Sequence, residues 1–242
     1  MIQVWSYGGG IQTAAIAVLV VRGELPRPDV VIMADTSREG TATWEYLDTV
    51  MRPYLAQIGL TVEVAPHSLT KWDLYYKSGI SLPLYHATGK FQTYCSANWK
   101  RDVVGRWLRQ HGVKRCQEWI GYSYDEIRRV KPDRLKWRQR RHPLVDMILT
   151  RADCYQIVVE DAGLPVPPKS ACWCCPHRNN REWRFLRDNY PRDWQAAIEL
   201  EAEVRQHDEV WLHRDRVPID QADIDSDTRL DVGQCGLGYC FL

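Results

Sequence analysis

The sequence lacks a long apolar stretch. Its strongest candidate, residues 11–21, follows three glycines and is too short to cross a bilayer as a helix. The residues before those glycines include no lysine or arginine, and no clear small-residue cleavage site follows. We therefore expect a cytoplasmic protein without a membrane anchor.

The sequence also lacks a charge bias, an internal repeat and any low-complexity tract. Lysine and arginine number 32 against 31 aspartates and glutamates, a formal net charge of +1. This balance excludes the strong overall field of a dedicated nucleic-acid or membrane binder. The 242 residues, 45% of them hydrophobic, suffice for one large domain or for a domain with a cap.

Eight cysteines occur in this chain. Without a secretory signal they argue against a disulfide scaffold and favour metal or redox chemistry in a reducing cytosol. Cys116 and Cys154 lie in apolar surroundings typical of a core. The other six occur near position 95, in the CWCC motif and at the C-terminal end.

Strand-like and helix-like patterns alternate in the first part of the chain. The predicted strands are residues 2–6, 30–34, 60–66 and 118–123. The predicted helices among them are residues 12–21, 43–58, 71–77 and 98–110. This alternation predicts an α/β fold, a Rossmann-like parallel sheet of about five strands flanked by helices.

After about residue 148 the strand patterns stop. Helical spacing then recurs at residues 151–162, 179–189 and 194–205. We therefore predict a nucleotide-binding α/β domain over residues 1–148 and a helical, cysteine-bearing region over residues 149–242.

Residues 6–13, SYGGGIQT, place Gly8, Gly9 and Gly10 between a predicted strand and a predicted helix. An ordinary tight turn is one interpretation. The other is a phosphate site, because glycines allow close backbone approach and a helix N-terminus attracts anions. Ligands of parallel sheets bind beyond the carboxyl ends of the strands, which groups this loop with residues 35–39 and 121–129.

The loop resembles the pyrophosphatase loop of the adenine-nucleotide alpha hydrolase superfamily, the PP-loop ATP pyrophosphatases. The segments ADTSREGTATWEYL, CSANWKRDVV, IGYSYDEIRR and ACWCCPHRN resemble further family segments in the same order. Over about residues 2–205 the chain is similar to the PAPS-reductase-like branch common in phages and prophages. The resemblance implies a HUP-type fold that binds ATP or a related adenine nucleotide.

The resemblance also assigns site residues. It implies nucleotide binding by Ser6, Gly8, Gly9, Gly10, Thr13, Asp35, Arg128 and Arg129. In the catalytic roles that it implies, Lys100 and Arg129 neutralise phosphate oxygens, and Asp35 contacts the nucleoside.

Four features differ from the family pattern. Gln12 and Thr13 stand where many relatives have aspartate and serine, and that aspartate would help to hold Mg²⁺. Ser96 replaces the second cysteine of the iron–sulfur reductases. The C-terminal CGLGYCFL also differs from the catalytic cysteine tail of sulfonucleotide reductases.

Cys172 and Cys175 form a Cys-x-x-Cys motif before Pro176, a spacing that lets both sulfurs reach one metal. The resemblance adds Cys95 and implies a [4Fe–4S] cluster. For the fourth ligand we select Cys240, with Cys174, Cys235 or an open iron as alternatives. Zinc bound by Cys172, Cys175, Cys235 and Cys240 is the competing interpretation.

Residues 128–142, RRVKPDRLKWRQRRH, contain eight lysines or arginines and one acid. A solvated loop is one interpretation. In the other, the phosphates are bound by Arg128, Arg129, Lys131 and Arg134, and Trp137 stacks on a base, which predicts a nucleic-acid substrate.

Together these features predict an iron–sulfur sulfurtransferase that adenylates an acceptor, from which a sulfur species then displaces AMP. A sulfur-donor or reductant protein would be its partner. A sulfonucleotide reductase and a non-catalytic nucleotide-binding protein of phage–host interaction are the alternatives.

Overall fold

The computed structural model describes residues 1–76, 79–133 and 135–226. The chain forms two compact units, each built from several segments. Among the described residues, unit 1 comprises Met1–Asp35, Ala42–Leu69 and Val103–Ser170, and unit 2 comprises Thr36–Thr41, Thr70–Asp102 and residues 171–226. The predicted boundary at residue 148 matches no unit limit, because residues 149–170 belong to unit 1 and residues 70–102 to unit 2.

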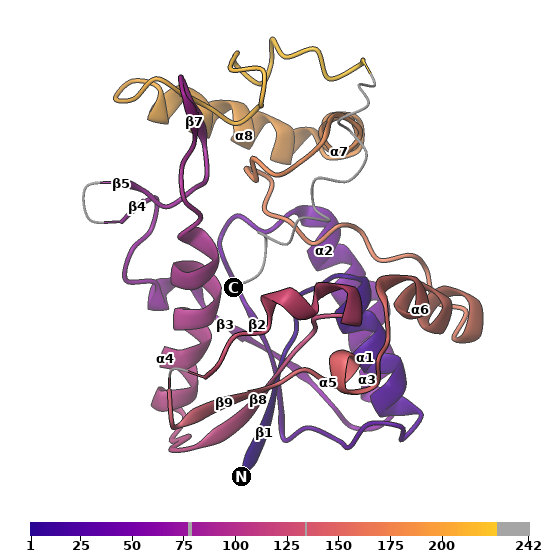
Figure 1. Cartoon of the computed structure of the whole chain (residues 1–242). Coiled ribbons are helices and arrows are strands. Elements are labelled where there is room, and N and C mark those ends of the chain that lie inside the picture. Colours follow the sequence, from indigo (N-terminus) through magenta and orange to yellow (C-terminus); the bar gives the residue numbers. More distant parts are fainter. Residues whose placement is uncertain (77–78, 134, 227–242) are drawn as a thin grey trace. The chain divides into compact units, whose positions relative to one another are not determined.

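Unit 1 is built on a parallel five-stranded sheet, as predicted (Figure 1). Its strands are β1 (Ile2–Ser6), β2 (Val30–Ala34), β3 (Val62–Ala65), β8 (Cys116–Ile120) and β9 (Arg138–Arg141), in the order β3-β2-β1-β8-β9. The central strand β1 pairs with β2 and β8, so Trp5 lies opposite Val31 on one side and Trp119 on the other.

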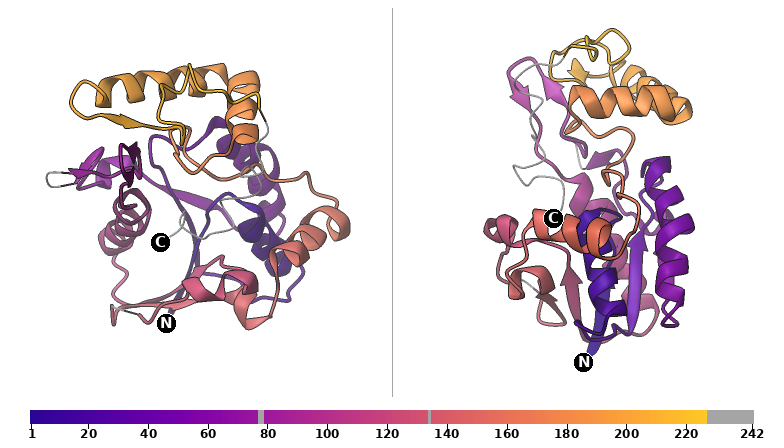
Figure 2. Two further views of the ribbon diagram at one scale, coloured as in Figure 1. Left: turned by 45° about the horizontal axis from the view of Figure 1, so that its top comes forward. Right: turned by 90° about the vertical axis from the view of Figure 1, so that its right-hand side faces the viewer.

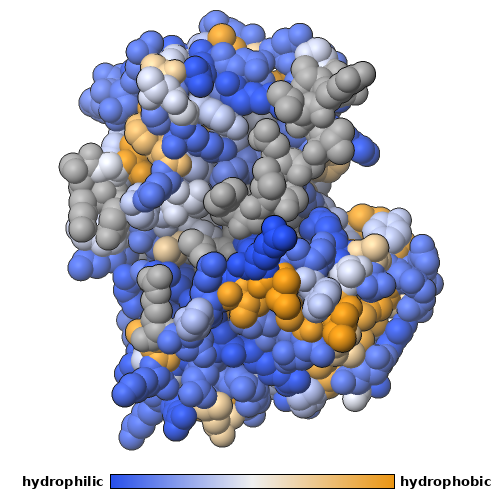
Figure 3. Space-filling view, viewed as in Figure 1, coloured by the Kyte–Doolittle hydropathy of each residue, from blue (hydrophilic) through white to orange (hydrophobic). Residues whose placement is uncertain are grey.

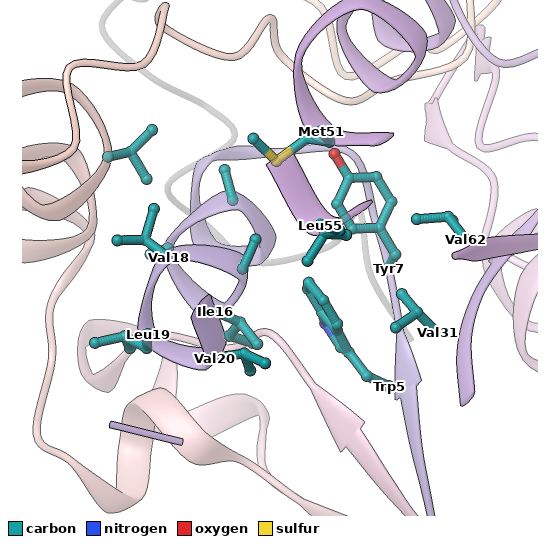
Figure 4. Packing of buried hydrophobic residues seen from close by; sticks show 14 of the residues in the cluster. Trp5, Tyr7, Ile16, Val18, Leu19, Val20, Val31, Met51, Leu55 and Val62 are labelled. Carbon is teal, nitrogen blue, oxygen red and sulfur yellow. The ribbon is translucent and has the colours of Figure 1, made fainter. Parts of the chain in front are cut away.

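Helices cover both faces of this sheet (Figure 2). They are α1 (Ile11–Val21), α2 (Thr41–Tyr46), η1 (Leu47–Met51), α3 (Arg52–Ala56), η2 (His67–Leu69), α4 (Asp102–Gln110), η4 (Tyr124–Arg129), α5 (Pro143–Asp146), α6 (Arg151–Tyr155) and η5 (Gln156–Asp161). Alternate strand residues point to opposite faces. Val4 accordingly packs with α4, and Trp5 with α1 (Figure 4).

Unit 2 has its own core. It contains β4 (Tyr75–Tyr76), β5 (Gly79–Ile80), β6 (Tyr85–His86), β7 (Gly89–Lys90), η3 (Ser96–Arg101), α7 (Asn180–Asn189), α8 (Pro191–Val204) and β10 (Val210–Trp211). Trp99 from η3, Trp183 from α7 and Leu200 from α8 belong to one buried cluster. No helix among the described residues is long and apolar enough to cross a membrane.

The structure corrects three sequence predictions. Residues 71–77, predicted as a helix, contain β4, which pairs antiparallel with β5. Strands do not stop at residue 148, because β10 pairs with β6. The basic stretch includes β9, which completes the five-stranded sheet beside β8.

Candidate functional site

The carboxyl ends of the neighbouring strands β1 and β8 lie where the order of the strands in the sheet reverses. The strand after β1 in the chain, β2, lies on one side of it, whereas β8 lies on the other. Such a switch point is where open parallel sheets bind ligands. The glycine loop, residues 6–13, follows β1, and residues 121–129 follow β8.

The glycine loop has a conformation that requires glycine. Gly9 has φ of +77°, and a Cβ there would lie 2.4 Å from Cγ2 of Thr43. Gly10 is the N-cap of α1, and no side chain caps that end. The carbonyl of Gly8 accepts a hydrogen bond from Oγ of Ser170. The loop is therefore fixed by the protein while it leads into a helix N-terminus, a geometry suited to an anion.

Thr43 and Ser170 lie against the glycine loop, a contact that the sequence analysis did not predict. Thr43 is 1% exposed, and its Oγ1 has no hydrogen-bond partner among the described residues. A buried hydroxyl normally has a partner. The sequence feature that could have indicated Ser170 is its position two residues before Cys172 of the Cys-x-x-Cys motif.

A polar network joins the glycine loop to the segment after β8. Gln12 donates from Nε2 to Glu126 at 3.0 Å and accepts from Arg151 at 3.3 Å. The other carboxylate oxygen of Glu126 pairs with Arg129 at 2.5 Å. The Arg129 guanidinium also lies over the ring of Tyr122, 4.3 Å from its centroid. A carboxylate therefore adjoins position 12, although it comes from η4.

The other predicted nucleotide ligands have varied positions. Ser6 donates its hydroxyl to Glu118 at 2.6 Å, and Thr13 donates to the carbonyl of Gly10 at 2.9 Å. Asp35 directly follows β2, at the same edge of the sheet as the glycine loop. Arg128 is exposed on η4.

Arg138 corrects the interpretation of residues 128–142 as a solvated loop. Its side chain is 5% exposed and pairs with Glu118, which is 2% exposed. Nε of Arg138 donates to Oε2 of Glu118 at 2.6 Å. This arginine therefore neutralises a buried carboxylate within the sheet and is unavailable to a surface phosphate.

Unit 2 gathers four of the cysteines, Cys95, Cys172, Cys174 and Cys175, which we call the thiol cluster. A turn joins two of them, since the amide of Cys175 donates to the carbonyl of Cys172 at 3.0 Å. Cys172 also forms an antiparallel bridge with Glu39. Cys95 immediately precedes η3 and packs against the same hydrophobic cluster as Cys172 and Cys174.

The thiols of the cluster interact electrostatically. Burial and the charge of Glu39 raise the pKa of Cys172 to about 12, against the opposing effect of Lys100. Burial also raises the pKa of Cys95, and the neighbouring Cys172 and Cys175 raise it further. The three cysteines predicted to share a metal centre therefore lie within one electrostatic neighbourhood of unit 2.

Two cations adjoin these thiols. Lys100 pairs with the fully buried carboxylate of Glu39 at 2.9 Å. Burial lowers the pKa of Lys100, but Glu39, Cys172 and Cys95 raise it overall. Arg38 lies 4.9 Å from the ring centroid of Trp99. Arg38 also pairs with Asp73 at 2.6 Å. Burial lowers the pKa of Arg38, but Asp73, Cys174 and Cys172 raise it overall.

This donor set fits an iron–sulfur cluster, whose irons are held by thiolates. Sulfurs around one zinc lie about 2.3 Å from it, hence within about 4 Å of one another. Among the described residues no three His, Cys, Asp or Glu side chains form a group that could hold a metal ion.

The other cysteine predictions divide by position. Cys116 and Cys154 are buried in unit 1, in agreement with a core role. Cys235 and Cys240, which include our choice of fourth ligand and half of the zinc alternative, lie outside the described residues. Cys174 is fully buried within the unit 2 core.

Unit 1 thus belongs to the class of parallel α/β domains with a glycine-rich loop at the switch point. No protein-family model matches the chain, and no curated protein matches it. Among solved structures it is similar to the U34-tRNA thiolase NcsA from Methanococcus maripaludis, a structure that contains a [4Fe–4S] cluster. The TM-score is 0.46 at 14% identity, over 85% of this chain and 72% of that chain.

Proposed function

We propose that the chain is an adenine-nucleotide-dependent sulfurtransferase that carries an iron–sulfur cluster. The observation that carries the proposal is the thiol cluster, in which Cys95 and the distant Cys172 and Cys175 lie within one unit. The glycine loop at the switch point supplies a second element, a place for nucleotide phosphates.

Each residue group has a defined task in this proposal. The amides at the start of α1 and the hydroxyl of Thr43 bind phosphate oxygens, and Ser170 holds the loop in shape through Gly8. Arg128 and Arg129 neutralise phosphate charge, and Asp35 binds the nucleoside. The acceptor is adenylated at an oxygen.

Cys95, Cys172 and Cys175 would hold the cluster, with Cys240, Cys174 or no protein ligand at the fourth iron. A bound [4Fe–4S] cluster supplies an iron that can carry sulfur. Lys100 and Arg38 then serve to balance the thiolate charge, and Glu39 fixes Lys100. Lys100 belongs to unit 2 and Arg129 to unit 1.

The cluster is tested by iron and sulfide content. Cys95→Ser protein, purified without oxygen, should lose most of its iron, its acid-labile sulfide and its broad visible absorption, because a three-thiolate site loses one ligand. Cys116→Ser, which alters a buried cysteine of unit 1, is the matched control and should keep all three. Full iron in folded Cys95→Ser protein, or colourless zinc-containing wild type, contradicts the proposal.

A test of the nucleotide site requires a substitution in the glycine loop that does not disturb folding. Gly9 is unsuitable because its φ of +77° and the contact with Thr43 forbid a side chain. Gly10 has an extended backbone, and a Cβ there would meet Ser170 at an ordinary 3.6 Å. Gly10→Ala should therefore fold normally while its methyl obstructs a phosphate.

We expect at least about tenfold weaker ATP binding by calorimetry for Gly10→Ala, the equivalent of losing one good hydrogen bond to a charged group. Melting temperatures of the two proteins without nucleotide provide the control for folding. Unchanged ATP affinity in the Gly10→Ala protein would remove the glycine loop from the site.

A further inference from the structure

Two tryptophans lie at the rim of unit 1, away from the glycine loop. Trp107 belongs to α4, and Trp137 directly precedes β9. Both are partly buried and pack against the same cluster of apolar residues under α4. Each ring is therefore held in place by the core while part of it remains accessible to solvent.

The planar side chain of another residue, an arginine or a histidine, stacks on each tryptophan ring. The Arg109 guanidinium lies over Trp137, 4.0 Å from the ring centroid. The His111 ring stacks on Trp107 with centroids 3.7 Å apart and planes inclined by 20°. Arg109 and His111 are both exposed, so each stack ends in a flat group that faces solvent.

The same segment is one-sided in charge. Residues 103–117 include four lysines and arginines and no acidic residue. Arg109, Lys114 and Arg115 are exposed. We call Trp107, Arg109, His111, Lys114, Arg115 and Trp137 the basic tryptophan patch. Because the whole chain has a net charge of only +1, this is a local excess.

Acidic residues next to the patch are already engaged. Glu118 is buried against Arg138, and Asp102, at the other end of α4 from the patch, pairs with Arg101 at 2.9 Å. Asp133 accepts from the amide of Arg140 at 3.0 and 3.1 Å. Glu118 and Asp102 are therefore neutralised by arginines outside the patch, whereas Asp133 keeps its charge because its partner is a neutral amide.

The patch lies at the opposite edge of the sheet from the glycine loop. It is formed where α4 ends and where β8 and β9 begin, whereas the loop follows the end of β1 (Figure 1). The amino ends of the strands, where the patch lies, are about 16 Å from the carboxyl ends, because a strand of five residues has that length. A ligand of the patch is consequently not the nucleotide of the glycine loop.

We propose that the basic tryptophan patch binds nucleic acid. Arg109, Lys114 and Arg115 contact backbone phosphates, and bases stack on the outer faces of Arg109 and His111. The proposal deepens the proposed function, on which it rests only for the idea that this nucleic acid contains the acceptor. An acidic polypeptide fits less well, because it has no planar groups to match the two rigid stacks.

Binding of a labelled 20-nucleotide single-stranded RNA of mixed sequence, followed by fluorescence anisotropy, tests this assignment. The Arg109→Gln/Lys114→Gln/Arg115→Gln variant is compared with wild type at several salt concentrations. The matched control, Arg181→Gln/Arg192→Gln/Arg205→Gln, removes three exposed cations of unit 2 and changes the net charge equally.

We expect the patch variant to bind RNA about 10–100-fold more weakly and to lower the slope of log K against log salt by about 2. The control variant should bind as wild type does. Arg109→Lys keeps the positive charge but removes the planar guanidinium on which a base would stack. It should therefore weaken RNA binding, and it should leave the binding of heparin, which has no bases, unchanged.

Equal weakening in both triple variants would overturn the proposal, because it would reduce the effect to net charge. Labelled polyglutamate bound as tightly as RNA would overturn it in favour of an acidic polypeptide. ATP binding, measured in the same proteins, should be unaffected. If wild-type protein does not bind ATP, the proposed function fails, but the comparison of RNA binding between the variants still tests the patch. Failure of one proposal can therefore be distinguished from failure of the other.

Discussion

The Arg138 guanidinium donates to both carboxylate oxygens of Glu118, and both side chains are almost fully buried. Ser6 donates to the same carboxylate from the end of β1. Space for the guanidinium comes from Gly105 of α4, where a Cβ would lie 2.9 Å from an Arg138 nitrogen. The pair therefore ties β1, β8 and β9 together beneath a helix that has a glycine at the contact.

Replacing Arg138 with leucine should lower the free energy of unfolding by about 3–5 kcal/mol, because it leaves the Glu118 carboxylate buried without its partner. Urea unfolding followed by circular dichroism measures the change. Lys136→Leu is the control, since Lys136 is exposed and its loss should change stability by less than about 0.5 kcal/mol. Similar losses in both variants would mean that the buried pair has no special role.

Single residues illustrate which parts of the site a sequence can predict. The glycine loop and the Cys-x-x-Cys motif are local patterns, so their positions follow from spacing alone. Arg138 looks like seven other basic residues of its stretch, and its burial depends on Glu118, 20 positions earlier. The partners of Gln12 are equally distant in sequence, at Glu126 and Arg151.

At the level of elements, the end of α5 has an unfavourable residue. Ile148 has φ of +58° and is 64% exposed. Its amide donates to Val145, and the next amide, of Leu149, donates to Leu144, a pattern in which glycine usually occupies the left-handed position. A β-branched residue there is strained. Ile127, Met147 and Ile148 are exposed apolar residues of this region. Apolar side chains gather over η4 and α5 in the space-filling view (Figure 3).

Ile148→Gly should therefore raise the free energy of unfolding by about 0.5–1 kcal/mol. The left-handed conformation costs an L-residue about 1–2 kcal/mol, and the greater freedom of glycine in the unfolded chain offsets part of that gain. Thermal unfolding monitored by circular dichroism provides the measurement.

Val166→Gly, which also removes an exposed β-branched side chain from unit 1, serves as the control and should give no gain. A loss of stability in Ile148→Gly would mean that the exposed isoleucine makes contacts worth more than its backbone strain.

Elements of unit 1 were largely predictable because their apolar residues face a single sheet. The bounds of β1 and β2 agree with the predicted residues 2–6 and 30–34. β8 begins two residues earlier than predicted, at Cys116. β9 was not predicted as a strand because its sequence, RQRR, has no apolar residue. The two-residue strands of unit 2 are too short for a period of two to show.

At the scale of the whole molecule, the chain passes between its units five times. The junctions follow residues 35, 41, 69, 102 and 170. Composition and periodicity report on contiguous segments, so they predicted two consecutive domains and could not show that residues 36–41 and 70–102 join residues 171–226. The predicted grouping of Cys95 with Cys172 and Cys175 came from the resemblance, since Cys95 lies 77 positions before Cys172.

This interleaving allows the two proposed ligands to be told apart by hydrogen exchange. A ligand that binds only the folded form stabilises by about 2.7 kcal/mol at 100 times its dissociation constant, and exchange slows where the backbone is held. ATP should protect residues 6–21 and 121–129 of unit 1. Reconstitution with iron and sulfide should instead protect residues 36–41, 94–101 and 171–178 of unit 2.

Backbone amides of each unit serve as the internal control for the ligand of the other. The protection by iron and sulfide should vanish in Cys95→Ser protein. The protection by ATP should fall in Gly10→Ala protein, to about 1.4 kcal/mol for a tenfold loss of affinity at the same ATP concentration, because each variant alters only one site. Protection of the glycine loop by iron, or of residues 171–178 by ATP in protein free of iron, would contradict the assignment of one ligand to each unit.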